Sequence, residues 1–193
     1  MPQAPIGRRS LLAGAALVPV TALKSAAQAA RSVFDEKQKR CLEAFTDRLV
    51  PHDEYGPSAV ECGVVEYIDR SLSDPNAGGK AAILAGLDAV DAVSRESQGA
   101  PLADLPPEQQ DAVLTALETG AATAPFFGTI RRLTLEGMFC DPYWGGNRNF
   151  AGWDLIRYPG PRLAVSAEDQ QIGVAVKPVR QSVSAAAGKS HGH

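Results

Sequence analysis

Residues 125–160 read PFFGTIRRLTLEGMFCDPYWGGNRNFAGWDLIRYPG, a helical pattern that runs directly into a loop rich in aromatic residues and glycine. In the first half, residues recur three or four positions apart, which places them on one face of a helix. They are Phe127, Ile130, Thr134 and Met138. Asp141-Pro142 ends this helix, because proline restricts the residue before it and has no N–H to donate. The stretch therefore predicts a long helix that leads into a shaped loop.

The loop holds both tryptophans of the chain, together with tyrosines, glycines and asparagines. Trp and Tyr are favoured anchors of protein interfaces, and glycine permits close backbone approach or positive φ. These rings could instead close the domain's own core, but they are more than a small helical core requires. We therefore predict a surface that contacts another protein. Its predicted residues are Tyr143, Trp144, Gly145, Gly146, Asn147, Trp153 and Tyr158.

The rest of the chain also reads as helices separated by capping and breaking residues. Helices are expected from the N-cap candidates Ser32 and Ser58, over residues 80–97, and after Leu105-Pro106-Pro107. Period-two alternation is weak and confined to residues 163–165 and 172–176. The sequence predicts an all-α fold, a compact bundle of about five helices with a long irregular C-terminal extension.

The first 29 residues have the pattern of an export signal. Arg8 and Arg9 precede a weakly apolar run, and Ala27-Gln28-Ala29 supplies a small-residue cleavage site. The arginine pair favours a twin-arginine signal over a general secretory signal with a chance arginine pair. The expected organisation is a signal peptide over residues 1–29, a helical domain with the aromatic loop over 30–160, and an irregular extension with a disordered tail over 161–193.

Composition excludes nucleic acid as a partner. The chain has 193 residues, of which 45% are apolar, enough for one domain with a core. The formal net charge is only −3, and loss of residues 1–29 removes three basic and no acidic side chains, which makes it −6. A protein with this balance has no electrostatic basis for binding a phosphate backbone.

Residues that carry chemistry in enzymes are sparse in this chain. His52 stands beside Asp53 and Glu54, but three sequence neighbours seldom converge on one metal ion, so a solvated turn is favoured. His191 and His193 lie in the tail. The sequence has no serine–histidine–aspartate set, no dinucleotide fingerprint, no haem-attachment motif and no cysteine cluster. We predict no catalytic, cofactor-binding or metal-binding residue here.

The odd number of cysteines suggests a free thiol or a bridge to another chain. Cys41 and Cys140 can also serve as small buried hydrophobes. If Cys41 pairs with Cys62, Cys140 remains beside the aromatic loop, where it is available for an intersubunit disulfide.

The loop motifs resemble the gluconate 2-dehydrogenase subunit 3 family, the small or γ subunits of membrane-associated flavoprotein dehydrogenases. The matching segments are DPYWGGN at 141–147, Gly152-Trp153, Tyr158-Pro159-Gly160, and weaker pieces at 49–51, 56–59 and 105–110. The similarity covers roughly Phe34 to Gly160. Two departures are the paired Tyr143-Trp144, where the family usually has a single aromatic residue, and Arg157 in place of a common glycine.

The resemblance implies a non-catalytic γ subunit that binds a large FAD-containing dehydrogenase subunit and escorts it through the twin-arginine translocase. This would explain an export signal for prefolded proteins on a chain without cofactor motifs, because the cofactor would belong to the partner. The family further implies a multihaem cytochrome c subunit with haem c, and a periplasmic complex associated with the cytoplasmic membrane. Alternatives are the γ subunit of a related glucose, 2-ketogluconate or polyol dehydrogenase, or a freestanding periplasmic binding protein or hydrolase that uses Asp53, Glu54 or Glu61.

Overall fold

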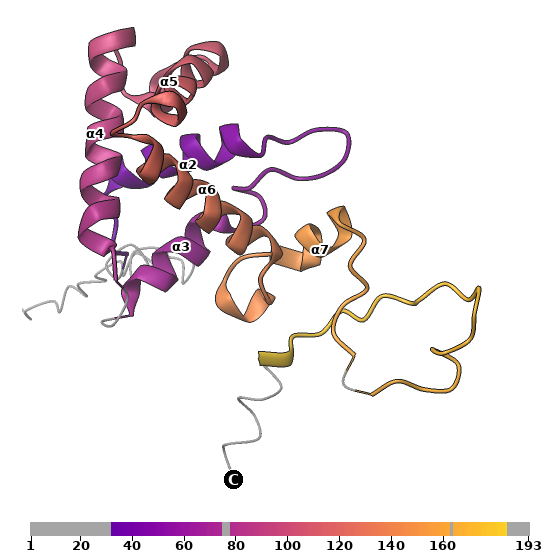
Figure 1. Ribbon diagram of the computed structural model, residues 1–193. Helices are drawn as coiled ribbons and strands as arrows, with labels where there is room; N and C mark the ends of the chain where they lie inside the picture. Colours follow the sequence, from indigo (N-terminus) through magenta and orange to yellow (C-terminus); the bar gives the residue numbers. More distant parts are fainter. Residues whose placement is uncertain (1–31, 75–77, 163, 185–193) are drawn as a thin grey trace, which may run out of the picture. The chain divides into compact units, whose positions relative to one another are not determined.

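The computed structural model describes residues 32–74, 78–162 and 164–184, and these ranges contain α-helices and short 3-10 helices but no strand (Figure 1). The α-helices are α2 (Glu36–Leu49), α3 (Val64–Ser73), α4 (Lys80–Gln98), α5 (Pro107–Thr119), α6 (Ala124–Phe139) and α7 (Ala151–Leu155). The 3-10 helices are η1 (Leu102–Asp104), η2 (Pro142–Trp144) and η3 (Arg148–Phe150). The predicted all-α class is confirmed. The expected export signal, His191 and His193 lie outside the described residues.

The glycine and proline residues predicted to bound α4, α5 and α6 do bound these helices in the structure. Gly99 ends α4 in a left-handed conformation with φ +85°, where its N–H donates to Arg95 O. Pro107 occupies the first position of α5, where its missing N–H costs no helical hydrogen bond. Gly120 caps α5, and α6 begins at Ala124. These helices begin and end near the predicted residues because glycine and proline act locally.

The N-terminal boundaries of α2 and α3 differ from the prediction. The N-cap of α2 is Asp35 and not Ser32: Asp35 and Gln38 exchange hydrogen bonds in a capping box. The hydroxyl group of Ser32 instead donates a hydrogen bond to Asp69 Oδ1 at 2.9 Å. Ser58 bonds with Glu61 in a turn that ends before the helix, and α3 starts only at Val64.

Gly63 explains the late start of α3. Its φ of +81° interrupts the helical path, and a Cβ on it would lie 2.9 Å from the carbonyl oxygen of Gly145 in the aromatic loop. The residue at this position must therefore be small and left-handed so that the loop can pack against the start of α3.

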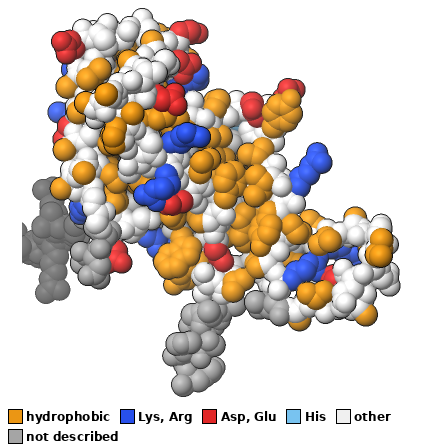
Figure 2. All heavy atoms as spheres, viewed as in Figure 1, with side chains coloured by type: hydrophobic (Ala, Val, Ile, Leu, Met, Phe, Trp, Pro, Cys, Tyr) orange, Lys and Arg blue, Asp and Glu red, His pale blue; other side chains and the backbone are white. Residues whose placement is uncertain are grey.

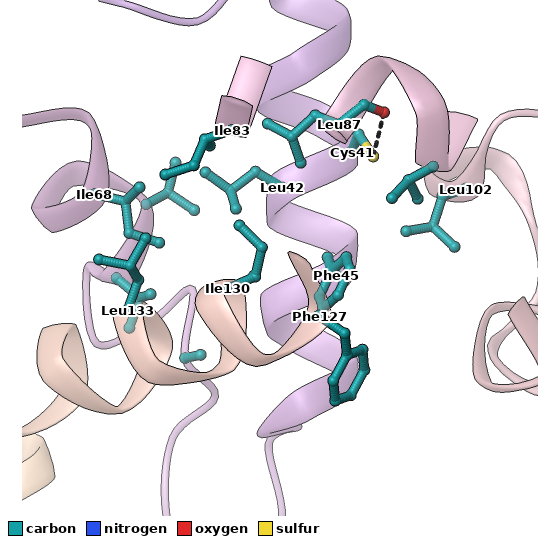
Figure 3. Packing of buried hydrophobic residues seen from close by; sticks show 14 of the residues in the cluster. Cys41, Leu42, Phe45, Ile68, Ile83, Leu87, Leu102, Phe127, Ile130 and Leu133 are labelled. Carbon is teal, nitrogen blue, oxygen red and sulfur yellow. Dashed lines mark hydrogen bonds between the residues drawn. The ribbon is translucent and has the colours of Figure 1, made fainter. Parts of the chain in front are cut away.

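The core lies where α2, α3, α4, α5 and α6 meet. Figure 3 shows side chains from α2, such as Leu42 and Phe45, directed toward Ile130 and Phe127 of α6. The rings of Phe45 and Phe127 lie 5.6 Å apart, centroid to centroid. The face predicted for α6 is confirmed, since Phe127, Ile130, Thr134 and Met138 are all buried. Each fully buried apolar side chain of this size stabilises the fold by roughly 1.5–3 kcal/mol.

Residues 161–162 and 164–184 contribute no α-helix to the bundle, in agreement with the predicted irregular extension, yet they are hydrogen-bonded to the preceding loop. The N–H of Val179 donates to Pro159 O at 2.6 Å, and Arg180 forms an ion pair of 2.5 Å with Asp154. The N–H groups of Val183 and Ser184 donate to the Asp141 carboxylate. Residues 183 and 184 therefore contact the residue that begins the aromatic loop, and residues 185–193 lie outside the description. Within the described residues, every helix is too short or too polar to cross a bilayer.

Candidate partner interface

The aromatic loop leaves α6 through a tight 3-10 turn that brings two large rings to the surface. Asp141 caps η2 by accepting a hydrogen bond from Tyr143 N at 3.0 Å, and Gly145 ends it with φ +101°. The rings of Tyr143 and Trp144 pack edge to face, 5.1 Å apart. Tyr143 remains 41% exposed and Trp144 49% exposed, which is unusual for residues of this size. We call these two residues the η2 pair.

Asn147 holds the loop together from the inside. This residue is fully buried, and its Nδ2 donates to Cys140 O at 2.9 Å. Its Oδ1 accepts hydrogen bonds from Gly152 N at 2.9 Å and from Trp153 N at 3.3 Å. The backbone of Asn147 adopts φ +44°, a left-handed conformation that asparagine tolerates better than most residues. One side chain thus fixes both the entry and the exit of the loop.

Two glycines allow the loop to lie directly on the last turn of α6. A Cβ on Gly146 would lie 2.0 Å from Gly137 O, and a Cβ on Gly152 would lie 1.8 Å from Met138 O. Real Cβ atoms do not approach backbone oxygen so closely, so no other residue fits either position without movement of the backbone. Gly146, which the sequence analysis placed in the interface, therefore holds the loop against α6 together with Gly152.

The loop is also attached to α3. Arg148 N donates to Cys62 O at 2.9 Å, just before α3 begins, and the Arg148 guanidinium lies 3.4 Å from the Glu66 carboxylate. Arg70 donates to Tyr143 O at 2.6 Å, and its guanidinium lies 5.2 Å from the centre of the Tyr143 ring. This cation–π geometry holds the exposed tyrosine ring in a defined position.

Trp153 is buried, unlike the other tryptophan. It is only 6% exposed, and its indole N–H donates to Phe139 O at 3.0 Å. Its ring packs between Phe150 at 5.4 Å and Tyr158 at 5.1 Å. Two of the predicted interface residues, Trp153 and Asn147, therefore have side chains that this chain itself covers. They shape the loop that presents the η2 pair and Tyr158.

A second group of exposed apolar side chains lies at α7, and two of its members were missed from the sequence. Tyr158 is 42% exposed, Ile156 is 54% exposed and Tyr55 is 76% exposed. The loop that carries Tyr55 reaches α7, since a Cβ on Gly56 would touch Leu155 at 3.2 Å. Figure 2 shows hydrophobic side chains gathered over this part of the molecule. The sequence analysis missed Tyr55 because it lies in a polar turn. It missed Ile156 because this residue caps a short helix that has no repeating apolar pattern.

All three cysteines are free thiols in the structure. The bridge considered between Cys41 and Cys62 is not formed; Cys41 Sγ instead donates to Leu87 O at 3.7 Å (Figure 3). Cys140 is partly buried and its Sγ lies 3.5 Å from Gly137 O. Burial raises the thiol pKa of Cys41, Cys62 and Cys140, which makes each a weak nucleophile at neutral pH.

The acidic turn after α2 is a solvated structural feature. His52 Nδ1 lies 2.8 Å from Glu61 Oε2, and the same oxygen accepts a hydrogen bond from Ser58 N at 2.7 Å. Asp53 closes its own turn by accepting from Tyr55 N and Gly56 N. Within the part of the chain that the structure describes, no three histidine, cysteine or acidic side chains converge as a metal site.

Comparison with known proteins gives one match. A family model described as gluconate 2-dehydrogenase subunit 3 matches residues 36–160, which run from the first residue of α2 to the glycine that closes the aromatic loop. No curated protein and no solved structure matches the chain.

Proposed function

The chain belongs to the gluconate 2-dehydrogenase subunit 3 family, and membership of this subunit family implies association with a larger dehydrogenase complex. We propose that the chain is a non-catalytic subunit that binds a large FAD-containing dehydrogenase subunit. The exposed η2 pair carries this proposal. Trp144 and Tyr143 are held at the surface by Arg70 and by the capped turn of η2, although burial of such rings is normally favoured. Large aromatic anchors of this kind dominate the affinity of many interfaces.

The rigidity of the loop supports the same function. Its path is fixed by Asn147 and by the backbone contacts of Gly146 and Gly152 before any partner arrives. A surface that is already ordered loses less conformational freedom on association than a surface that must fold on binding. The loop is therefore built for docking, and the redox chemistry belongs to the partner.

The second part of the proposal concerns export. We infer that residues 1–29 form a twin-arginine signal that carries the prefolded flavoprotein with this subunit to the periplasm, where a multihaem cytochrome c subunit joins the complex at the cytoplasmic membrane. The Arg8-Arg9 pair supports this inference. Conversion of Arg8 and Arg9 to lysine should leave complex formation intact in cell extracts and abolish periplasmic dehydrogenase activity. Full periplasmic activity in this variant would contradict the export role.

Co-expression with the neighbouring flavoprotein tests the docking function. The tagged chain should retain a yellow large subunit that oxidises gluconate or a related sugar with a dye acceptor, whereas the chain purified alone should have neither flavin nor activity. Trp144→Ala should weaken retention by at least about thirtyfold, which corresponds to about 2 kcal/mol. Leu135→Ala is the matched control, because Leu135 is 42% exposed on α6 and is not part of the loop. Equal retention by both variants would remove the η2 pair from the interface.

The intersubunit disulfide of Cys140 stays a prediction. The thiol lies beside the loop and is partly exposed, so a cysteine of the large subunit could reach it. Non-reducing electrophoresis of the complex tests it: a band at the summed mass that disappears in Cys140→Ser supports the bridge, and separate subunits without reductant exclude it.

A further inference from the structure

Beyond α7 the chain makes an arm, residues 164–178, whose base is closed by one arginine. Arg162 Nη1 lies 2.5 Å from Asp169 Oδ1, and Arg162 Nη2 donates to Lys177 O at 2.6 Å. Pro159 O accepts the N–H of Val179 at the point where the arm returns. The ribbon traces the arm as an open loop between α7 and the end of the described chain (Figure 1). Its base is thus fixed to the candidate interface.

The returning half of the arm has the side-chain pattern of a β-strand. Ile172 is 103% exposed, Val174 is 48% exposed and Val176 is 51% exposed. These β-branched residues alternate with Gly173, Ala175 and Lys177, so an extended backbone would place them on one face. The sequence shows this period-two run, yet residues 172–176 form no strand in the structure. The segment therefore has the residue pattern of a β-strand but no neighbouring strand to pair with among the described residues.

The backbone of this segment is available for pairing except at Lys177 O, which accepts from Arg162, and at Val174 N, which donates to Gln171 O at 3.5 Å. Among the described residues, the N–H groups of Ala175, Val176 and Lys177 donate to no protein acceptor, and residues 171–178 are all exposed. Pro178 lacks an N–H, so pairing must end there. Gly173 has φ +83° and bends the chain inside the segment, so residues 172 and 173 must extend when the segment pairs. A lone strand of this length gains little by itself, but it gains both hydrogen bonds and apolar contacts when it joins a sheet edge.

We propose that residues 172–177 add a strand to an unpaired sheet edge of the large dehydrogenase subunit, with Ile172, Val174 and Val176 in apolar pockets on that subunit. This inference rests on the proposed function and names a second contact for it. The described part of this chain offers no sheet to receive the segment. The arm joins the same element that carries Tyr158, because Arg180 pairs with Asp154 of α7 and Val179 bonds to Pro159, so one partner can cover both surfaces.

Hydrogen exchange of the purified complex tests the pairing directly. Amides of residues 173–177 should exchange within seconds in the chain alone and at least about tenfold more slowly in the complex, because strand pairing removes their access to water. Amides of Ser166 and Asp169, in the outgoing half of the arm, provide the internal comparison. Unchanged exchange at 173–177 in an intact complex would overturn the proposal.

Substitutions separate the side-chain face from the backbone. Val174→Asp with Val176→Asp should lower affinity for the large subunit at least about tenfold, because two charges would enter apolar pockets. Val165→Asp is the matched control, since Val165 is 59% exposed on the same arm but outside the strand pattern. Ala175→Pro removes an amide donor of one strand edge and keeps Ile172, Val174 and Val176. Val176→Pro, compared with Val176→Ala, removes an amide donor of the opposite edge. At least one of these proline variants should also lose affinity about tenfold.

The outcomes are distinguishable. If the wild-type chain captures no flavoprotein, the proposed function fails. If it captures the flavoprotein and the aspartate variants bind equally well, the arm proposal fails while the function stands. Loss of affinity in the aspartate variants with none in either proline variant would replace strand addition by side-chain contact alone. A concentration-dependent dimer of the isolated chain that Ala175→Pro abolishes would assign the segment to self-association and overturn the proposal.

Discussion

Asn147 and Gly152 are joined by a hydrogen bond of 2.9 Å, from the backbone N–H of Gly152 to the buried Oδ1 of Asn147. This bond closes the loop that carries the η2 pair, and Nδ2 of the same side chain holds Cys140 O. The loop is therefore a small folded unit with its own polar centre, and its exposed rings depend on that centre.

Replacement of Asn147 by alanine should lower the free energy of unfolding by about 2–4 kcal/mol. Three side-chain hydrogen bonds would be lost, and their backbone partners would remain buried without acceptors or donors. Urea denaturation followed by circular dichroism measures the change. Asn149→Ala is a suitable control, because Asn149 also has positive φ, +57°, but is exposed. Equal losses in both variants would show that backbone strain, and not the buried amide, sets the cost.

Alanine at Gly146 or Gly152 should destabilise the chain by about 1–3 kcal/mol or more, because each added methyl group would overlap a backbone carbonyl oxygen of α6. Gly128→Ala should have the opposite effect. Gly128 is in the middle of α6 with open space around its Cβ position, so alanine should stabilise the helix by about 0.5–1 kcal/mol. Thermal denaturation of the three variants compares them, and a tolerated Gly152→Ala would mean that the loop does not rest on α6 as described.

The two tryptophans should respond differently to truncation. Trp153→Ala should cost about 3–5 kcal/mol of stability, because the indole is buried and donates to Phe139 O. Trp144→Ala should change stability by less than about 0.5 kcal/mol, since half of the ring already faces solvent. Denaturant titration of the isolated chain, together with retention of the large subunit, distinguishes the roles. Comparable stability losses would place Trp144 in the core as well.

The pKa of His52 should lie above its ordinary value of about 6.5, because the hydrogen bond and charge of Glu61 favour the imidazolium. The pKa of Glu61 should lie below its ordinary range for the same reason, with a further contribution from Ser58 N–H. The contribution of His52 is complete below its unfolded pKa and disappears as pH rises through the raised folded pKa. That of Glu61 is complete above its unfolded pKa and disappears as pH falls through the lowered folded pKa. Both contributions to stability are therefore complete between about pH 4.5 and 6.5.

A proton NMR titration of the His52 ring tests this pair. Glu61→Gln preserves an acceptor for Ser58 N–H and removes the charge, so the His52 pKa should fall toward its ordinary value. An identical titration in both proteins would show that the contact is absent in solution.

Sequence patterns predicted α4, α5 and α6 because Gly99, Pro107 and Gly120 act on the residues next to them. The start of α3 was misplaced because it depends on a distant contact: Gly63 bends the chain to make room for Gly145 O. No local pattern carries that information. Ser58 is a residue type that commonly caps helices, and it does exchange hydrogen bonds with Glu61. These bonds belong to a turn that ends before α3 begins.

The sequence predicted the aromatic loop as the interface, but it could not separate the buried residues of that loop from the exposed ones. Trp144 and Trp153 have the same side chain and similar glycine-rich neighbours. Their difference arises from Phe139 O, which receives the indole N–H of Trp153, and from Asn147, which fixes where the chain turns. Tyr55 joins the exposed group only because its loop reaches α7. Such assignments require the tertiary arrangement.

The hydrogen bond from Arg148 N to Cys62 O links residues that are far apart in the sequence, at the junction of the loop with α3. The final form of the loop depends on contacts with both α3 and α6, so the η2 pair has its native arrangement only when these helices are packed. A partner that bound this pair would therefore select folded copies of the chain over unfolded ones.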